Sequence, residues 1–222
     1  MFKSVLVSAF SIVLLMSLMC SLSVQPLHAD LPVAETADQV NPLRTGQRAP
    51  GFVVKDVNGD AFAFHPNALQ RPVVIVTFRG GWCPYCNMHL SELHTVVPEI
   101  AAMGVDVLFL SGDRPETLYT SLGPETQATI DGLDYQIYSD ADAQAAVAFG
   151  LAFETSGQMI QRRADKGQDV AGSSMLKHGV LAVPAVYAID TTGMIRFDFV
   201  EPNYKVRLPA PELLAVAREI VE

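Results

Sequence analysis

The sequence has few cysteines for its length: Cys20, Cys83 and Cys86 are the only three in 222 residues. A chain of this size held together by disulfides needs many more, so we expect a hydrophobic core and a local role for the cysteines. Basic residues are also scarce, with 15 Lys and Arg against 24 Asp and Glu, and the formal net charge is −9. This balance would repel a phosphate backbone and argues against nucleic-acid binding. Half of the residues are apolar and 18% are charged, which predicts a compact folded domain.

The N-terminal segment accounts for one cysteine and much of the apolar content. Lys3 is the only Lys, Arg, Asp or Glu among residues 1–29, and residues 5–24 are apolar or serine throughout. The pattern predicts a secretory signal peptide that is cleaved after Ala29. The alternative is an uncleaved membrane anchor over 5–24, which approaches the roughly 20 residues that a spanning helix needs. We expect an exported protein, periplasmic or secreted, with no stable membrane association after cleavage.

A short polar segment separates this leader from the folded part. Residues 30–45 are rich in Pro, Ala and acids without apolar periodicity, which predicts an N-terminal tail followed by a domain over 46–222. The domain opens with a strand pair around Asn58-Gly59, a dipeptide that favours the tight turn of a hairpin. Residues 72–78 form a continuous β-branched run, typical of a strand that is buried on both faces of an α/β sheet.

Alternating strand and helix patterns follow. We expect a helix from about 90 that Pro98 kinks and Gly104 ends, a strand at 105–110, a helix at 115–122, a strand at 135–138, a helix at 140–149, a hairpin of 183–189 with 194–200, and a helix at 211–221. Residues 151–180 are the least regular part, with an exposed helix or a loop over the active face as the two interpretations. Their basic cluster, Arg162, Arg163 and Lys166, is predicted to be a solvated face.

The motif with the clearest chemistry is Cys83-Pro84-Tyr85-Cys86, placed at the end of a buried strand and the start of a helix. At a helix N-terminus, unpaired amide groups and the helix dipole stabilise a thiolate on the first cysteine. Proline suits the first helical turn, where no amide donor is needed. Cys86 can then attack an oxidised Cys83 and close an intramolecular disulfide, so the pair can cycle between dithiol and disulfide.

Three other uses of the pair are weaker. A structural disulfide across four residues would close little chain and stabilise little. A zinc site needs about four ligands, and only His89 and His94 lie near. Haem attachment needs histidine directly after Cys86, where Asn87 stands. We therefore expect neither a metal nor a cofactor.

These residues resemble the thioredoxin-fold redox proteins. The Trp-Cys-Pro-Tyr-Cys segment at 82–86 looks like the active site of thioredoxins and glutaredoxins, and Val183-Pro184 is similar to their cis-proline. Residues 46–52 with the hairpin that follows, and residues 190–200, resemble peroxiredoxins of the alkyl hydroperoxide reductase and thiol-specific antioxidant family. The resemblance implies a thioredoxin-like α/β fold, with a central mixed β-sheet flanked by helices and an N-terminal β-hairpin extension.

The resemblance also implies the site residues, with substrate contacts at Trp82, Pro84, Tyr85, Val183 and Pro184. The sequence departs from both families. The peroxiredoxin spacing Pro-x-x-x-Thr-x-x-Cys fits neither cysteine, and Thr77 stands where thioredoxins keep a buried carboxylate, so the proton-handling group is missing or elsewhere. Arg79 is a candidate activator, because a guanidinium near the dithiol favours thiolate. A surface arginine at a strand end is the equally weighted alternative.

The sequence thus predicts a peroxiredoxin-like thiol oxidoreductase. Cys83 would attack a hydroperoxide, Cys86 would resolve the sulfenic acid, and a donor thiol or thioredoxin-like reductant would reset the pair. If the peroxiredoxin register were set on Cys86 in spite of its mismatches, Cys86 would be the nucleophile instead. The first alternative is disulfide reduction or isomerisation in exported proteins. The second is a copper-binding or metalloprotein-assembly factor, with His89 as a candidate third ligand.

Overall fold

A computed structural model describes residues 33–133 and 135–221. All of these residues belong to one compact unit. The predicted signal peptide over 1–29 and the alternative membrane anchor over 5–24 lie outside the described residues. Within the described ranges, no helix is both long and apolar enough to cross a membrane.

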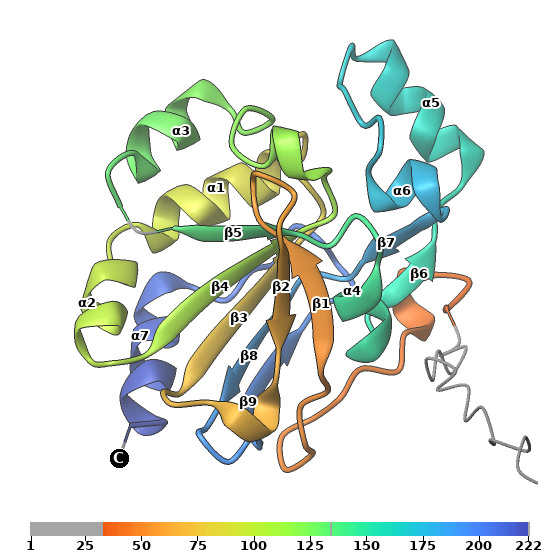
Figure 1. Cartoon of the computed structure of the whole chain (residues 1–222). Helices are drawn as coiled ribbons and strands as arrows, with labels where there is room; N and C mark the ends of the chain where they lie inside the picture. The colour runs from red at the N-terminus through yellow and green to blue at the C-terminus, as the bar shows by residue number, and fades with distance from the viewer. Residues whose placement is uncertain (1–32, 134, 222) are drawn as a thin grey trace, which may run out of the picture. The chain divides into compact units, whose positions relative to one another are not determined.

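A seven-stranded mixed sheet forms the centre of this unit, in the order β2-β1-β5-β4-β3-β8-β9 (Figure 1). Its strands are β1 (Phe52–Lys55), β2 (Ala61–Phe64), β3 (Val73–Phe78), β4 (Asp106–Ser111), β5 (Gln136–Ser139), β8 (Ala185–Ile189) and β9 (Ile195–Val200). β3 is buried at every position and pairs parallel with β4 and antiparallel with β8. Burial on both faces explains its unbroken β-branched sequence. The predicted mixed sheet is confirmed.

The predicted hairpin is the β1–β2 pair, which turns at Gly59 with a φ of +86°. The pair joins the sheet through the Lys55–Ser139 pairing between β1 and β5. A separate two-stranded sheet pairs β6 (Ala152–Glu154) with β7 (Val180–Ala182). These two strands lie at the two ends of residues 151–180, the least regular part of the sequence.

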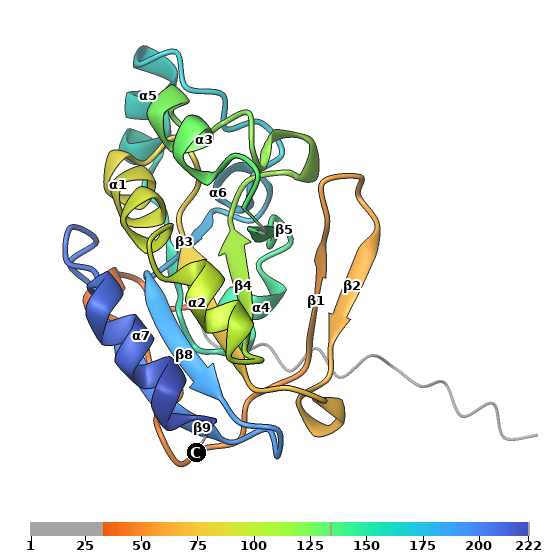
Figure 2. The ribbon, with the colours of Figure 1, turned by 90° about the vertical axis from the view of Figure 1, so that its left-hand side faces the viewer.

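Helices cover this sheet. They are α1 (Pro84–Leu93), α2 (Val97–Ala102), α3 (Pro124–Ile130), α4 (Gln144–Ala148), α5 (Gly157–Asp165), α6 (Ser174–Lys177) and α7 (Ala210–Glu219), with short 3₁₀ turns η1 (Ala37–Gln39), η2 (Pro66–Ala68) and η3 (Pro115–Thr117). Figure 2 shows α1, α2 and α7 along one face of the sheet. The predicted kinked helix is two helices, because Pro98 falls in the first turn of α2, where its missing N–H costs nothing.

The segment predicted to be a tail is packed where the structure describes it. The Ala34 N–H donates to the Ala152 carbonyl at 3.0 Å, and the Leu43 N–H donates to the Phe149 carbonyl at 3.0 Å. Ala34 and Leu43 also pack against the hydrophobic core. Residues 33–45 therefore belong to the folded unit. Their partners lie more than 100 positions away, so no local periodicity reveals them.

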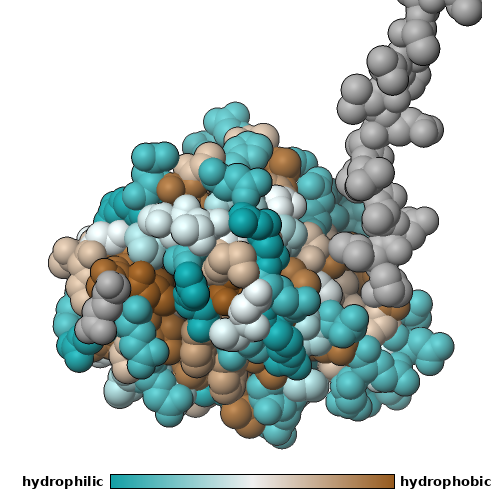
Figure 3. Space-filling model, turned by 90° about the horizontal axis from the view of Figure 1, so that it is seen from below, coloured by the Kyte–Doolittle hydropathy of each residue, from teal (hydrophilic) through white to brown (hydrophobic). Residues whose placement is uncertain are grey.

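The core lies on both faces of the central strands. Val74, Ile75 and Val76 of β3 are fully buried, and stacked ring pairs such as Phe109–Tyr135 and Phe149–Tyr187 fill the layers beside the sheet. Hydrophobic residues also reach the surface: seen from below, a group of them lies among hydrophilic ones (Figure 3). Apolar atoms make up much of the surface of ordinary folded proteins.

Candidate active site: a dithiol at the start of helix α1

The chain leaves β3 at Phe78 and enters α1 six residues later. Cys83 is the N-cap residue, in extended conformation, and Pro84 is the first residue of the helix. The Cys83 carbonyl accepts the amides of Cys86 and Asn87 at 3.0 and 3.1 Å, so it closes the first helical turn. The predicted position of the dithiol at the junction of strand and helix is confirmed.

The two thiols are free, buried and different in acidity. Cys83 is 2% exposed and Cys86 is 1% exposed. The hydrogen bond from the Cys86 thiol lowers the pKa of Cys83 to about 6, and the charges of Arg207 and Arg79 act in the same direction. Burial raises the pKa of the Cys86 thiol well above its ordinary value. The arrangement therefore favours a Cys83 thiolate that is held by a protonated Cys86.

Arg79 is inside the protein rather than on its surface. It is 7% exposed, and its guanidinium carbon lies 4.2 Å from the centre of the Tyr204 ring and 5.5 Å from that of Phe153. Burial lowers the pKa of Arg79, while the two cysteines raise it. The surface alternative is thus wrong, because the side chain is buried beside two aromatic rings and close enough to both cysteines for the charges to affect one another.

Arg207 is a second cation at the site, and it was not among the residues predicted from the sequence. Its Nη2 donates to the Cys86 sulfur at 3.4 Å, from a position 121 residues further along the chain. It belongs to residues 201–209, the segment between β9 and α7. The same segment sets Tyr204 edge-on to Tyr85, with ring centres 5.5 Å apart, and Lys205 over the Tyr85 ring. No local motif marks this segment, so only the fold brings it to the dithiol.

Trp82 is covered from the irregular 151–180 region. The guanidinium carbon of Arg163 lies 4.8 Å from the centre of the Trp82 ring, and the side-chain amide of Gln168 donates to the Trp82 carbonyl at 2.9 Å. The predicted solvated face holds for Arg162 and Lys166, which are exposed. It is wrong for Arg163, because the planar guanidinium stacks on the indole.

The predicted cis-proline is not found. No described residue follows a cis peptide bond, so Pro184 is trans. The backbone of Val183 is engaged within the protein: its N–H donates to the Leu151 carbonyl, and its carbonyl accepts the Thr77 hydroxyl at 3.2 Å. The same hydroxyl accepts the Ala185 amide at 2.9 Å. Thr77 therefore bridges the backbone on both sides of Pro184, and the expected presentation of Val183 to a substrate is corrected.

A buried carboxylate supports the loop before the dithiol. One oxygen of Asp113, just after β4, accepts the Gly81 amide at 2.7 Å and the Ser121 hydroxyl at 3.0 Å. Burial raises the pKa of Asp113, and these hydrogen bonds oppose the rise. A side chain at Gly80 or Gly81 would collide with this arrangement, since an added Cβ at Gly80 would lie 2.6 Å from Asp113.

Metal ligands are not grouped in the described ranges, where no cluster of three or more His, Cys, Asp or Glu could hold an ion. His89 is buried, with Nε2 3.0 Å from the Leu208 carbonyl. Burial lowers the pKa of His89 to about 4, so this ring is neutral and its Nε2–H donates to that carbonyl.

Comparison with known proteins places the chain in a family. The AhpC/TSA family model matches residues 45–198. Peroxiredoxin Bcp of Escherichia coli is 31% identical over 117 residues, which span 53% of this chain and 70% of the relative. Thiol-disulfide oxidoreductase ResA of Halalkalibacterium halodurans is 24% identical over 110 residues, 49% of this chain and 57% of ResA. The structure of reduced Prx3 from Vibrio vulnificus has the same fold, with a TM-score of 0.58 at 19% identity over 79% of this chain and 99% of that one. The chain belongs to the AhpC/TSA family and is a thiol oxidoreductase of the peroxiredoxin-like kind.

Proposed function

We propose that this protein reduces hydroperoxides with the Cys83/Cys86 dithiol at the expense of a donor thiol or a thioredoxin-like reductant. The observation that most supports it is the stabilised Cys83 thiolate, which lies at a helix N-terminus with Arg79 and Arg207 acting on it. A thiolate near neutral pH is the form that attacks peroxide.

The order of the steps follows from the opposite pKa shifts of the two cysteines, lowered at Cys83 and raised at Cys86. The Cys83 thiolate attacks the terminal oxygen of the peroxide, the O–O bond breaks, and the leaving alkoxide or hydroxide takes a proton from solvent. Cys83 becomes a sulfenic acid. The Cys86 sulfur then attacks the Cys83 sulfur and gives up its proton, water leaves, and the disulfide forms. Two electrons from the donor thiols restore the dithiol.

The test is single-turnover oxidation of the reduced protein by hydrogen peroxide, followed through the fluorescence of Trp82, the only tryptophan in the sequence. We expect oxidation orders of magnitude faster than that of a free small thiol. Cys83→Ser should remove the reaction, whereas Cys86→Ser should consume about one equivalent of peroxide and then stop. A fully active Cys83→Ser protein would move the nucleophile to Cys86, and oxidation no faster than that of a small thiol would exclude a peroxidase.

Disulfide exchange with exported proteins is the second candidate. The Trp-Cys-Pro-Tyr-Cys segment and the similarity to ResA favour it. Reduction of insulin disulfides by the reduced protein distinguishes the two functions, because a peroxidase with a covered dithiol should reduce insulin slowly. No contact in the described ranges favours the copper alternative.

We propose further that the protein is exported, on the evidence of the leader pattern in residues 1–29 alone. N-terminal sequencing of the protein recovered from outside the cytoplasm should begin at Asp30. Recovery in the membrane fraction with Met1 retained would favour the anchor over 5–24 instead.

A further inference from the structure

A large cleft lies beside the dithiol, and peroxide reduction does not use it. Its volume is about 1270 Å³. Cys83 does not line the cleft, but both of its chain neighbours, Trp82 and Pro84, do. A hydroperoxide fills a small part of such a space, since sites for drug-sized molecules measure about 300–1,000 Å³. The cleft has room for a peptide segment that reaches the residues flanking Cys83.

Two walls of the cleft are fixed to each other. One is a face of α1, where Pro84, Asn87 and Ser91 recur at helical spacing, and the other is formed by residues 117–126. The Asn87 side chain joins them, because its Oδ1 accepts the Gly123 amide at 2.6 Å. The opening is therefore a built feature of the fold.

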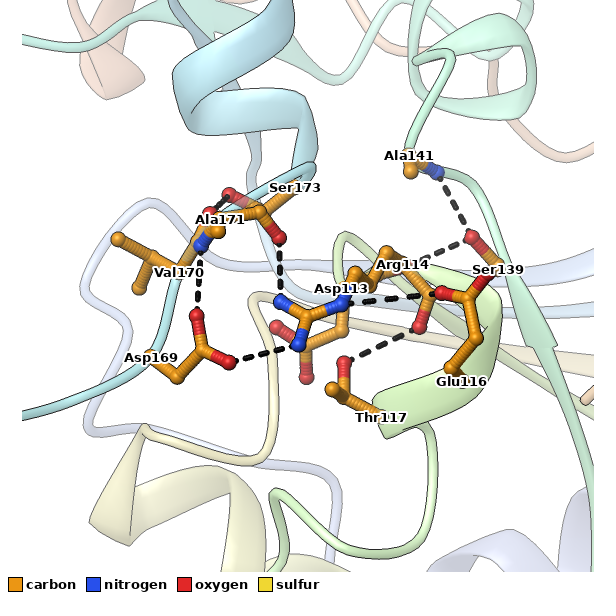
Figure 4. A network of polar contacts seen from close by, with 10 residues as sticks. All are labelled: Asp113, Arg114, Glu116, Thr117, Ser139, Ala141, Asp169, Val170, Ala171 and Ser173. Atoms are coloured by element: carbon orange, nitrogen blue, oxygen red, sulfur yellow. Dashed lines mark hydrogen bonds and ion pairs between the residues drawn. The ribbon is translucent and has the colours of Figure 1, made fainter.

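A third wall comes from the connection between α5 and α6, and Arg114 fixes it. Its guanidinium binds Asp169 and the Ala171 carbonyl, each at 2.7 Å, and also lies 3.7 Å from Glu116 (Figure 4). Arg114 is the N-cap residue of η3, so these contacts attach Asp169 to the start of η3. Docking into a preformed cleft costs little ordering of the protein.

The lining indicates the chemistry of an occupant. Glu92, Glu125 and Asp169 line the cleft, and no Lys or Arg is among its described lining residues. Arg114 neutralises Asp169. Two carboxylates without an ion partner among the described residues remain in the lining: Glu92, whose Oε1 accepts the Ala210 amide at 2.9 Å, and the exposed Glu125. Met88 lines the cleft together with Trp82, Pro84, Leu122 and Pro124. It is 66% exposed, the largest exposed fraction among the large apolar side chains of the described ranges. Methionine adapts to varied contact surfaces.

We propose that this cleft receives a basic, partly apolar segment of the protein that reduces the Cys83–Cys86 disulfide. The inference rests on the proposed function, because a reductant is needed only in a turnover cycle. The partner's thiolate attacks the Cys83 sulfur, and Cys86 leaves as a thiolate and is protonated. A second thiol of the partner then breaks the mixed disulfide, so the partner ends as a disulfide and this chain as a dithiol.

The experiment measures reduction of the oxidised protein by two short synthetic dithiol peptides, one flanked by lysines and one by glutamates, with dithiothreitol as the small donor. The signal is Trp82 fluorescence. Glu125→Lys and Met88→Gln alter the cleft. Glu212→Lys is the matched control, because Glu212 is also exposed in the first turn of a helix and this substitution changes the net charge by the same amount. Leu176→Gln is the control for Met88→Gln, since Leu176 is an exposed apolar residue of α6.

We expect the lysine peptide to reduce the wild type faster than the glutamate peptide. Glu125→Lys and Met88→Gln should each lower kcat/KM for the lysine peptide by roughly 3- to 10-fold through KM, with the dithiothreitol rate unchanged. Equal losses in Glu125→Lys and Glu212→Lys would overturn the docking site, because they would report only the charge of the whole surface. Equal losses in Met88→Gln and Leu176→Gln would overturn it as well. Oxidation by peroxide is measured separately, so failure there removes the peroxidase and leaves the docking result standing.

Discussion

Two arginines from distant parts of the chain act on one pair of sulfurs. Arg79 precedes the dithiol by four residues, whereas Arg207 follows it by more than 120 and donates directly to the Cys86 sulfur. Neither has a carboxylate ion partner among the described residues. Arg79 is buried and Arg207 is partly buried. Cations that are shielded from solvent and lack acidic partners stabilise whatever negative charge develops near them, and here that charge is the thiolate. The acidity of the dithiol is therefore set by individual side chains as much as by the helix.

At this scale the first prediction concerns pH. The pKa of Cys83 is lowered to about 6, so the thiolate is present above that pH and is lost as the pH falls through it. The single-turnover rate with hydrogen peroxide should be nearly constant from pH 7 to 8 and fall about tenfold per unit well below 6. Arg79→Met should move the inflection to higher pH. A wild-type inflection near 8 or above would contradict the assignment of Cys83 as the activated thiol.

A second prediction concerns Arg207. Replacing it with Met removes the hydrogen bond to the resolving sulfur, and we expect disulfide closure to slow by about tenfold, because hydrogen bonds to charged groups contribute about 1.5–3 kcal/mol. Rapid-quench measurement of the sulfenic acid lifetime checks it. Arg207→Lys should restore part of the rate, and Arg162→Met, on the exposed side of α5, should match the wild type. An unchanged closure rate in Arg207→Met would show that the contact has no catalytic consequence.

The dithiol is enclosed by elements rather than by one loop. The start of α1 holds the cysteines, residues 201–209 cover Arg79 and Tyr85, and the connection after α5 covers Trp82. Asn87 secures the first of these elements, with side-chain hydrogen bonds to the carbonyls of Gly81 and Cys83 at 2.6 and 3.0 Å. In the sequence, Asn87 excludes haem attachment and carries no sign of this supporting role.

A third prediction belongs to this element. Asn87→Ala leaves the Gly81 carbonyl and the Gly123 amide without their partner, so we expect the free energy of unfolding to fall by about 2–3 kcal/mol. Reduction by the basic peptide should weaken as well, because the cleft loses the bond between its walls. Denaturant titration and peptide kinetics measure the two effects. Gln161→Ala removes one exposed hydrogen bond on α5 and should change neither; a wild-type stability for Asn87→Ala would contradict the prediction.

At the scale of the whole molecule, we expect stability to depend on whether the dithiol is reduced or oxidised. Closing the disulfide removes the thiolate and leaves the buried Arg79 and the partly buried Arg207 without a counter-charge. A protein whose reduced form is stabilised in this way is a comparatively oxidising couple, and its disulfide is readily reduced. That property suits a pair that must be reset in every cycle.

A fourth prediction follows for stability. Because the folded-state pKa of Cys83 lies below its unfolded value, the thiolate contributes stability to the reduced form that is present at alkaline pH and lost as the pH falls through about 6. At pH 8 the reduced protein should melt several degrees above the oxidised one, since 1 kcal/mol corresponds to about 2–4 °C for a chain of this size. The gap should shrink at pH 5. Calorimetry of both forms tests this, and a more stable oxidised form at pH 8 would contradict it.

The sequence by itself determined the class of fold and the place of the chemistry. The β-branched run of β3, the hairpin turn at Gly59 and the Cys-x-x-Cys pair at a helix start are local patterns, and local propensity and burial periodicity are enough to locate them. The cysteine count was equally informative, since only two cysteines remain outside residues 1–29 and both belong to one motif.

Tertiary structure decided everything that depends on distant partners. Arg207 reaches Cys86 across 121 positions, Arg163 stacks on Trp82, and Ala34, near the start of the described residues, pairs with Phe153 of β6. The trans Pro184 and its neighbours bridged by Thr77 belong to the same group. An arginine looks the same in the sequence whether its guanidinium faces solvent or contacts a sulfur. Its environment depends on how the whole chain packs, because the residues around it come from distant positions.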